Sequence, residues 1–295
     1  MPELPEMAGL ADFLAATVVG TRVVDVQVAA LNAIKTADPP LSAAVDRTVT
    51  RAGRCGKWLE LQLGEESPLF LLVHLSRAGW VVWRDNPPNR PVRMGSGPLA
   101  VRVTFADQDG VIRGALDLTE AGSRKRLAVH LVTDPQQVQA VAELGPDALS
   151  AELNETGFKE LLQQAGRRQL KSVLCDQRVI AGIGNAYSDE ILHAAQLSPS
   201  ARCNSLSDAE IAQLYQSMRE LLAAATERLR GLDPSAFKDS KRTDLAVHGR
   251  TGEACPVCSD TIREVASADS SHQYCPDCQT GGQILADRRM SKLLK

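Results

Sequence analysis

Four of the seven cysteines lie in two Cys-x-x-Cys pairs, Cys255–Cys258 and Cys275–Cys278. Each pair can present two thiolates to one metal ion from a tight turn, and two pairs complete a tetrahedron. Four sulfur ligands leave no open coordination position, so the spacing predicts one structural Zn²⁺ ion; chance spacing and redox pairs are the alternatives. Residues 261–274 are long enough for a β-hairpin, and we expect His272 within it at the surface rather than on the metal.

A glycine turn between two helical segments is the second feature with chemical potential. The run Val179–Asn185 reads Val-Ile-Ala-Gly-Ile-Gly-Asn, and its glycines permit backbone shapes that other residues hinder. Asn185 opens the second helix, where backbone N–H groups and the helix dipole favour an anion such as a DNA phosphate. Lys171 adds a positive charge to the same region. The alternative is an ordinary helical hairpin with Asn185 as a plain N-cap.

The amino terminus offers a nucleophile. If Met1 is removed, Pro2 carries a free secondary amine, and an α-amine has a pKa near 8, far below that of lysine. Attack of such an amine on an aldehyde carbon gives an iminium ion, which is an electron sink for elimination. The adjacent Glu3 is placed to shuttle protons. The alternative is that Pro2 and Glu3 only mark the start of a helix.

Length and composition set the frame for these features. The chain has 295 residues, a hydrophobic content of 44% and a net charge of −3, which indicates a globular protein of one to three domains. No apolar run approaches the roughly 18 residues of a membrane span. The start has no basic region typical of a secretory signal, so we expect a cytosolic protein. Near-neutral charge is compatible with a nucleic-acid enzyme that has a local basic groove.

The elements that must position these residues change along the chain. Apolar spacing predicts a helix that opens near Pro5, followed by a β-sandwich assembled from strands such as the alternating run 58–63. From residue 151 to about 232 the apolar residues recur at helical spacing. Ser207 and Glu210 form the pattern of a capping box at the start of one helix.

Together the motifs resemble those of the Fpg/Nei family of DNA glycosylases. The shared features, in the family's order, are the terminal Pro-Glu-Leu-Pro-Glu, Gly56-Lys57 before a strand, the Gly-Ile-Gly-Asn turn, the run Val247–Glu253 and the four-cysteine finger. The resemblance covers residues 2 to about 280. It implies an α+β multidomain fold. Its expected parts are a catalytic helix-plus-β-sandwich domain at 1–133, a helix–two-turn–helix domain at 134–249, a zinc finger at 250–280 and a flexible basic tail at 281–295.

The resemblance also implies roles for individual residues. Pro2 would attack the sugar C1′, Glu3 would protonate the sugar or assist its ring opening, and Glu6 would support the site or orient a water. Lys57 would contact phosphate and assist the chemistry. The target nucleotide would leave the base stack to reach Pro2. The residues expected to contact DNA are His74, Arg77, Arg124, Arg126, Lys171, Asn185 and Arg250.

Three departures from the family pattern concern the DNA-facing loops. The usual His-Leu-Gly-Met-Ser-Gly run is His74–Gly79 here, with Arg77 in place of a residue that fills the gap left by the flipped base. The usual Asp-Pro-Arg-Arg-Phe-Gly loop is replaced by residues 120–126, which lack the aromatic wedge and include three basic residues; a solvated turn is the alternative.

Ser270 stands where the finger normally has an arginine. The tail is an electrostatic arm or a disordered end, and its basic residues are Arg288, Arg289, Lys292 and Lys295.

The sequence therefore predicts a bifunctional DNA glycosylase and AP lyase that forms a Schiff base at Pro2. The altered loops favour bulky, crosslinked, unstacked or single-stranded lesions over 8-oxoguanine. The alternative is a relative that binds damaged DNA with little or no cutting. We expect damaged DNA as the partner, no membrane association, and a monomer in the cytoplasm, at the nucleoid in a bacterium.

Overall fold

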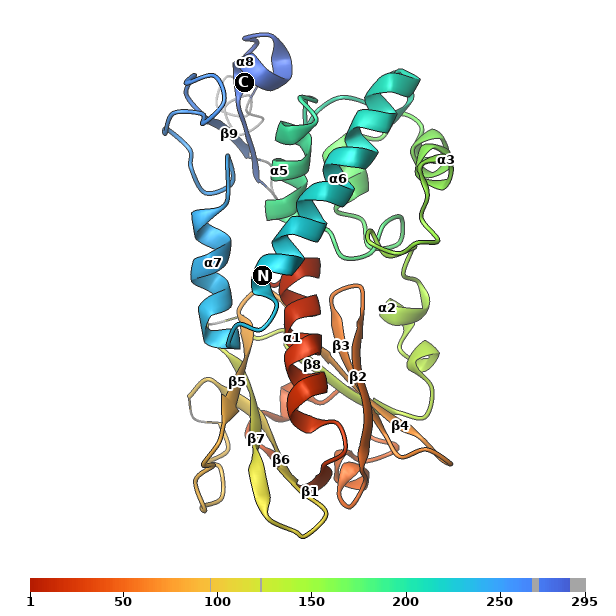
Figure 1. The fold of residues 1–295 in the computed structure, drawn as a ribbon, viewed down its shortest axis with the longest axis vertical. Helices are drawn as coiled ribbons and strands as arrows, with labels where there is room; N and C mark the ends of the chain where they lie inside the picture. Colours follow the sequence, from red (N-terminus) through yellow and green to blue (C-terminus); the bar gives the residue numbers. More distant parts are fainter. Residues whose placement is uncertain (96, 123, 267–270, 287–295) are drawn as a thin grey trace, which may run out of the picture. The chain divides into compact units, whose positions relative to one another are not determined.

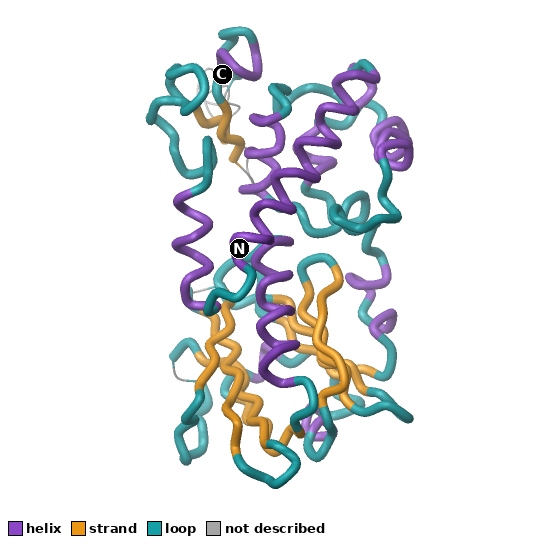
Figure 2. Tube along the Cα trace, in the orientation of Figure 1, coloured by secondary structure: helices purple, strands orange, loops and turns teal. Residues whose placement is uncertain are grey.

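The structure is a computed structural model that describes residues 1–95, 97–122, 124–266 and 271–286. It divides into two compact units. The first comprises Met1–Glu143 with Leu229–Lys238, and the second comprises Leu144–Arg228 with Asp239–Lys295. Ser270 and the four basic tail residues from Arg288 to Lys295 lie outside the described residues. Figure 2 shows that strands dominate the first unit and helices the second.

Helix α1 (Leu4–Val18) opens the first unit, as the apolar spacing predicts. Proline stands in its first turn, where a missing N–H costs no hydrogen bond. Its apolar stripe is almost completely buried and joins the core of the unit; the stripe consists of Leu4, Met7, Leu10, Ala11, Leu14 and Val18. The helix ends before Gly20, whose φ of 85° no longer fits an α-helix.

Two antiparallel four-stranded sheets complete this unit (Figure 1). One has the order β1-β6-β7-β5 and the other β2-β3-β4-β8. The bounds are β1 (Arg22–Val28), β5 (Gly79–Arg84), β6 (Leu99–Ala106) and β7 (Ile112–Glu120), and β2 (Val49–Cys55), β3 (Trp58–Leu63), β4 (Leu69–His74) and β8 (Ala128–Val132). In β3 the alternate residues Leu59, Leu61 and Leu63 are buried in the core with α1. The predicted sandwich with a leading helix is confirmed.

One glycine of α1 allows a later segment to dock. Phe237 and Leu229 belong to the first unit and pack into its core. A Cβ placed on Gly9 would lie 2.9 Å from two ring atoms of Phe237 and 3.2 Å from the Leu229 Cβ. These distances are shorter than van der Waals contact, so the close approach depends on glycine at this position.

The second unit holds the main helices, α3 (Glu155–Ala165), α4 (Leu170–Leu174), α5 (Asn185–Ala194) and most of α6 (Asp208–Leu229). The Ser207 hydroxyl accepts from the Glu210 N–H at 3.3 Å while the Glu210 carboxylate accepts from the Ser207 N–H at 2.7 Å, which is the predicted capping box. Of the shorter elements, η4 (Cys203–Ser205) lies in this unit and α7 (Phe237–Thr243) is divided between the two units. The first unit holds α2 (Gln139–Ala142) and the 3₁₀ turns η1 (Leu31–Ala33), η2 (Leu41–Ala44), η3 (Pro135–Gln137) and η5 (Pro234–Ala236).

The cysteine module lies in the same unit. Strands β9 (Arg263–Ala266) and β10 (Ser271–Tyr274) pair antiparallel and form the predicted hairpin, and α8 (Pro276–Thr280) follows it. Ile262 and Val247 fill a small core beside Cys255 and Cys275. In the part of the chain that the structure describes, no helix combines the length and the apolar character that membrane crossing requires.

Candidate active site and zinc centre

The start of α1 brings the two acidic candidates together. Glu3 is the N-cap residue and Glu6 lies in the first turn. The Glu6 Oε2 accepts from the Glu3 N–H at 2.7 Å, and the two glutamates form a capping box. Each is only 2% exposed, and Pro2 is buried beside them. Carboxylates at a helix N-terminus interact favourably with the helix dipole, so two buried acids are held in the helix start that directly follows Pro2.

Lys57 occupies a tight turn between β2 and β3. Cys55 pairs with Trp58, so Gly56 and Lys57 form a two-residue hairpin turn, and Gly56 supplies a φ of 53°. The Lys57 side chain is buried. Burial of the His74 ring and, to a lesser extent, the positive charge of Lys57 lower the pKa of His74 to about 4. His74 is therefore a neutral imidazole near pH 7, with one hydrogen-bond donor and one acceptor.

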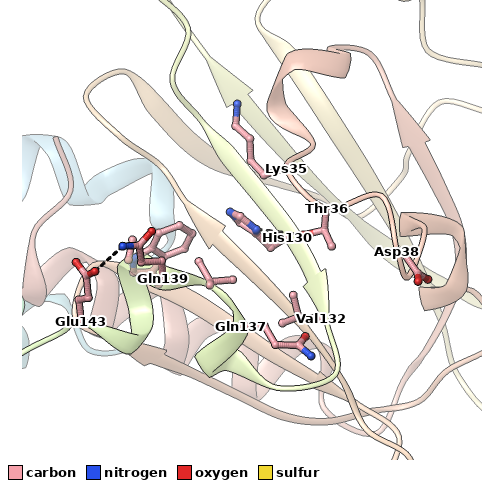
Figure 3. A pocket seen from close by; sticks show the side chains of 11 residues that line it. Lys35, Thr36, Asp38, His130, Val132, Gln137, Gln139 and Glu143 are labelled. Atoms are coloured by element: carbon pink, nitrogen blue, oxygen red, sulfur yellow. Dashed lines mark hydrogen bonds between the residues drawn. The ribbon is translucent and has the colours of Figure 1, made fainter.

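An aromatic cluster supports this turn. Trp58 pairs with His74 in the sheet, with ring centroids 4.8 Å apart, and the centroid of the His130 ring lies 5.6 Å from that of Trp58. Trp58 and His130 also line a hollow of about 630 Å³ bounded by Lys35 and Gln139 (Figure 3). Neither Trp58 nor His130 stands in a sequence motif that marks it as a site residue. Since Trp58 follows Lys57 directly, the cluster fixes the strand end that carries the lysine.

Strand registers gather the remaining candidates of this unit at one end of the sandwich. His74 pairs with both Trp58 and Ala128, and Gly79 pairs with Glu120. The turn at Lys57 and the loops that carry Arg77 and Arg126 therefore lie at the same end of the strands in their sheets. Figure 1 shows the start of α1 at this end of the unit as well.

Two short loops present the basic residues that replace the family's fillers. In the β4–β5 loop, Ser76 adopts a φ of 54° where the family pattern has glycine, and Arg77 is exposed next to it. The Ala121 N–H donates to the Ala78 carbonyl at 3.1 Å, so the β7–β8 loop lies directly beside this loop.

Glu120, the last residue of β7, holds the backbone of the β7–β8 loop that carries the basic residues. Its Oε1 accepts the backbone N–H groups of Arg126 and Leu127 at 2.6 and 3.0 Å. Arg124 and Arg126 are exposed. Hence the structure brings Arg77 and both arginines of the second loop to one surface, in place of an apolar wedge.

In the second unit, Gln177 fixes the glycine turn ahead of Asn185. Its Nε2 donates to the carbonyls of Cys175 and Ile183, and its Oε1 accepts from the Gly182 N–H at 3.0 Å. Asn185 begins α5 and is half-buried. The sequence gives no signal for this role of Gln177, because a glutamine in a polar turn forms no distinctive pattern.

Lys171 lies inside the second unit rather than at its surface. It is 1% exposed, it forms an ion pair with Asp189, and its Nζ donates to the Ser271 carbonyl at 2.8 Å. The other Asp189 oxygen lies 2.8 Å from the His248 Nδ1. The structure thus uses Lys171 to tie β10 to α5, and a phosphate contact by this ammonium requires a rearrangement.

Arg250 is also engaged within the chain. Its Nε donates to the Glu253 carboxylate at 2.8 Å, and its Nη1 contacts the carbonyls of Leu245 and Ala246 at 3.4 and 3.2 Å. These bonds shape the segment that leads into the cysteine module. The guanidinium is partly exposed, with about a third of its side chain accessible.

The four cysteines converge as a metal site requires. All four Sγ atoms lie within 4.8 Å of one another, with 3.8 Å between Cys255 and Cys278 and 3.3 Å between Cys258 and Cys275. A tetrahedron with Zn–S bonds of about 2.3 Å has sulfurs about 3.8 Å apart. The donor set and its size fit one structural Zn²⁺ ion, which would hold the two knuckles together.

Comparisons with known proteins agree with this assembly. Residues 1–114 match the formamidopyrimidine-DNA glycosylase N-terminal domain, residues 144–233 its H2TH domain, and residues 252–281 the zinc finger found in FPG and IleRS. The formamidopyrimidine-DNA glycosylase of Symbiobacterium thermophilum is 33% identical over 302 residues, which covers 98% of this chain and 93% of that protein. The chain belongs to the formamidopyrimidine-DNA glycosylase family.

Two further relatives place the chain within that family. An uncharacterized formamidopyrimidine-DNA glycosylase-like protein of Mycobacterium tuberculosis is 53% identical over 152 residues, covering 52% of this chain and 94% of that protein. The crystal structure of Lactococcus lactis formamidopyrimidine-DNA glycosylase, non-covalently bound to DNA with an AP site, superposes with a TM-score of 0.80. It is 25% identical and covers 94% of this chain and 99% of its own. The family, the fold and the four-cysteine zinc finger expected from the motifs are confirmed.

Proposed function

We propose that this protein is a DNA repair glycosylase with AP lyase activity, and that it forms a Schiff base with damaged DNA through the Pro2 amine. One observation carries the proposal: Glu3 and Glu6 form a buried capping box beside Pro2, at the end of the sandwich where the Lys57 turn lies. If Pro2 and Glu3 only marked a helix start, neither a buried N-cap carboxylate nor a buried lysine at the same end of the sandwich would be needed. The L. lactis relative binds AP-site DNA, which supports DNA of this kind as the ligand.

The chemistry uses this chain's own groups in two stages. After Met1 is removed, the Pro2 nitrogen attacks C1′ of the sugar and the glycosidic bond breaks. The departing base takes up a proton, and the Pro2 nitrogen loses its proton. Glu3 donates a proton to the ring oxygen as the C1′–O4′ bond breaks, which gives an iminium ion. Loss of a C2′ proton then expels the 3′-phosphate, and water hydrolyses the iminium to release Pro2.

Supporting groups position the acid and the DNA strand. Glu6 holds the Glu3 backbone through its 2.7 Å hydrogen bond and thereby orients the Glu3 carboxylate. Lys57 and neutral His74 would meet a phosphate at the end of the sandwich, with exposed Arg77, Arg124 and Arg126 nearby. The other DNA contacts proposed are Asn185 and Arg250, and also Lys171 once its buried ion pair with Asp189 has opened. We propose that the protein acts as a monomer in the bacterial cytoplasm, since its named relatives are bacterial.

The loops support a shifted lesion preference. An aromatic wedge partly offsets the cost of unstacking a base, about a few kcal/mol per step. Here exposed arginines lie on the β4–β5 and β7–β8 loops instead. A guanidinium can stack on the base left unpaired by flipping only after the DNA base stack has opened. We therefore propose that the enzyme favours lesions that are already unstacked, bulky, crosslinked or in single strands.

A lesion panel tests this proposal. Single-turnover base release is compared for 8-oxoguanine paired with cytosine and for the same lesion in a single strand or a bulge. We expect release from the bulge or the single strand to be at least tenfold faster. Efficient excision from the intact duplex would contradict the lesion preference. Tight binding without base release or strand cleavage on every substrate would contradict the enzymatic proposal and favour a damage-binding role.

A further inference from the structure

Helix α5 seats the cysteine module through one continuous polar face. His193 follows Asp189 by four residues and Glu190 by three, spacings that place it on the same side of the helix as each of these carboxylates. Glu190 accepts the backbone N–H groups of residues 246, 247 and 248 at 2.7–3.0 Å. Asp189 meets the His248 ring. The segment that enters the zinc finger is therefore held by two carboxylates of this face.

The third member of that face reaches the metal site itself. The Nε2 of His193 lies 3.3 Å from the Sγ of Cys255, within the range of a hydrogen bond to sulfur. His193 is 5% exposed and Cys255 is 2% exposed. A cysteine that ligates zinc carries no proton, so its sulfur can only accept. The contact is then an Nε2–H···S bond from the helix to a zinc thiolate.

We infer that His193 is a positioning residue of the zinc site, which donates a hydrogen bond to the Cys255 thiolate and couples the metal centre to helix α5. Groups that hydrogen-bond to metal ligands orient them and tune their charge, and their loss commonly weakens metal binding by 10- to 100-fold. Four thiolates give a zinc site a net charge of −2, so a buried N–H donor offsets part of that charge. The Val257 N–H, 3.5 Å from the same sulfur, adds a backbone donor.

This role differs from simple packing. If the His193 ring only filled space, another ring of similar size could replace it without weakening zinc binding. If His193 acts as a hydrogen-bond donor, only a side chain that places an N–H group near the Cys255 sulfur could replace it. His193→Phe and His193→Gln separate these two cases, because phenylalanine keeps the ring and glutamine keeps an amide N–H near the position of Nε2.

The test measures zinc release from the intact zinc-loaded protein into excess chelator, with a metal-sensitive dye as the readout. We expect release from His193→Phe to be about tenfold faster than from wild type, and release from His193→Gln to stay within about threefold. His130→Phe changes a histidine of the first unit and serves as the matched control, with unchanged release. Wild-type rates in His193→Phe, or equal acceleration in both His193 variants, would overturn the inference.

A second measurement keeps the inference falsifiable if His193→Phe does not fold. The wild-type protein is loaded with ¹¹³Cd in place of zinc and examined by NMR. A scalar coupling between the cadmium nucleus and the imidazole Nε2–H proton of His193 is expected, because such coupling passes through the hydrogen bond and the thiolate. A well-resolved imidazole proton without this coupling would overturn the assignment.

Discussion

His74 shows how one residue's environment sets its chemistry. Burial and the nearby Lys57 lower its pKa to about 4, against 6.5 for an ordinary histidine. As the pH falls through 6.5 the unfolded chain takes up a proton at this residue, while the folded chain does not until about pH 4. The free energy of unfolding should therefore fall over this window, by about 3 kcal/mol from His74 alone.

This pH dependence is measured by urea unfolding of wild type and His74→Gln at several pH values between 7.5 and 4. Glutamine stays neutral throughout, and every other titrating group is common to both proteins. The difference in unfolding free energy between the two proteins should shrink or reverse as the pH falls. Parallel pH profiles would show that His74 is protonated as easily in the folded state as in the unfolded one.

Helix α1 illustrates constraint at the level of an element. Gly→Ala in a helix ordinarily stabilises by about 0.5–1 kcal/mol. At Gly9 the added Cβ meets the Phe237 ring at 2.9 Å, so the sign reverses. We expect Gly9→Ala to destabilise by about 1–3 kcal/mol in chemical unfolding.

The matched control for Gly9 is another helical glycine. At Gly157 in α3 an added Cβ would meet only the Asn154 Oδ1, at 3.5 Å. Gly157→Ala should therefore be neutral or stabilising. Equal effects of the two substitutions would mean that the Phe237 contact does not constrain α1.

Local signals predicted most of the elements, whereas contacts distant in sequence decided the details of the site. The capping box at Ser207, the alternation in β3 and the paired cysteines each depend on neighbours within a few residues. The burial of Lys171 depends on Asp189, eighteen residues away, and on Ser271, one hundred residues away. The sequence predicts Lys171 as a positive charge near Asn185 but does not indicate these partners, because spacing along the chain carries no information on them.

Ser76 shows the same limit in a loop. The sequence presents it as a departure from the family's glycine, yet it keeps the left-handed φ of 54° that a glycine would adopt. A glycine would occupy this conformation without strain, so the loop has a backbone shape that also suits the family's glycine. Register pairing then brings this loop beside the β7–β8 loop, which spacing along the chain could not indicate.

At the scale of the whole molecule, we predict that local charge outweighs the net charge of −3 in DNA binding. Arg124 and Arg126 are exposed at the end of the sandwich that carries Lys57, whereas Arg113 is exposed near the start of β7, at the opposite end. Each lost phosphate contact reduces the slope of log Kd against log salt concentration by about one. The Arg124→Gln/Arg126→Gln double variant should lower the slope by about two for DNA with an abasic site.

The salt dependence is followed by fluorescence anisotropy at several salt concentrations. Arg113→Gln should retain the wild-type slope, since its side chain lies at the far end of the strand. A slope reduced as much by Arg113→Gln as by the double variant would contradict a DNA surface at the Lys57 end.

Borohydride trapping on a duplex with an abasic site tests the central claim most directly. Reduction fixes the iminium as a stable protein–DNA adduct, and mass spectrometry of the digested adduct locates it. We predict an adduct at the Pro2 amine of the processed wild-type chain and a strongly reduced yield for Glu3→Gln, whose amide cannot donate the proton. Tight binding without an adduct, or an adduct on a lysine side chain, would contradict the account.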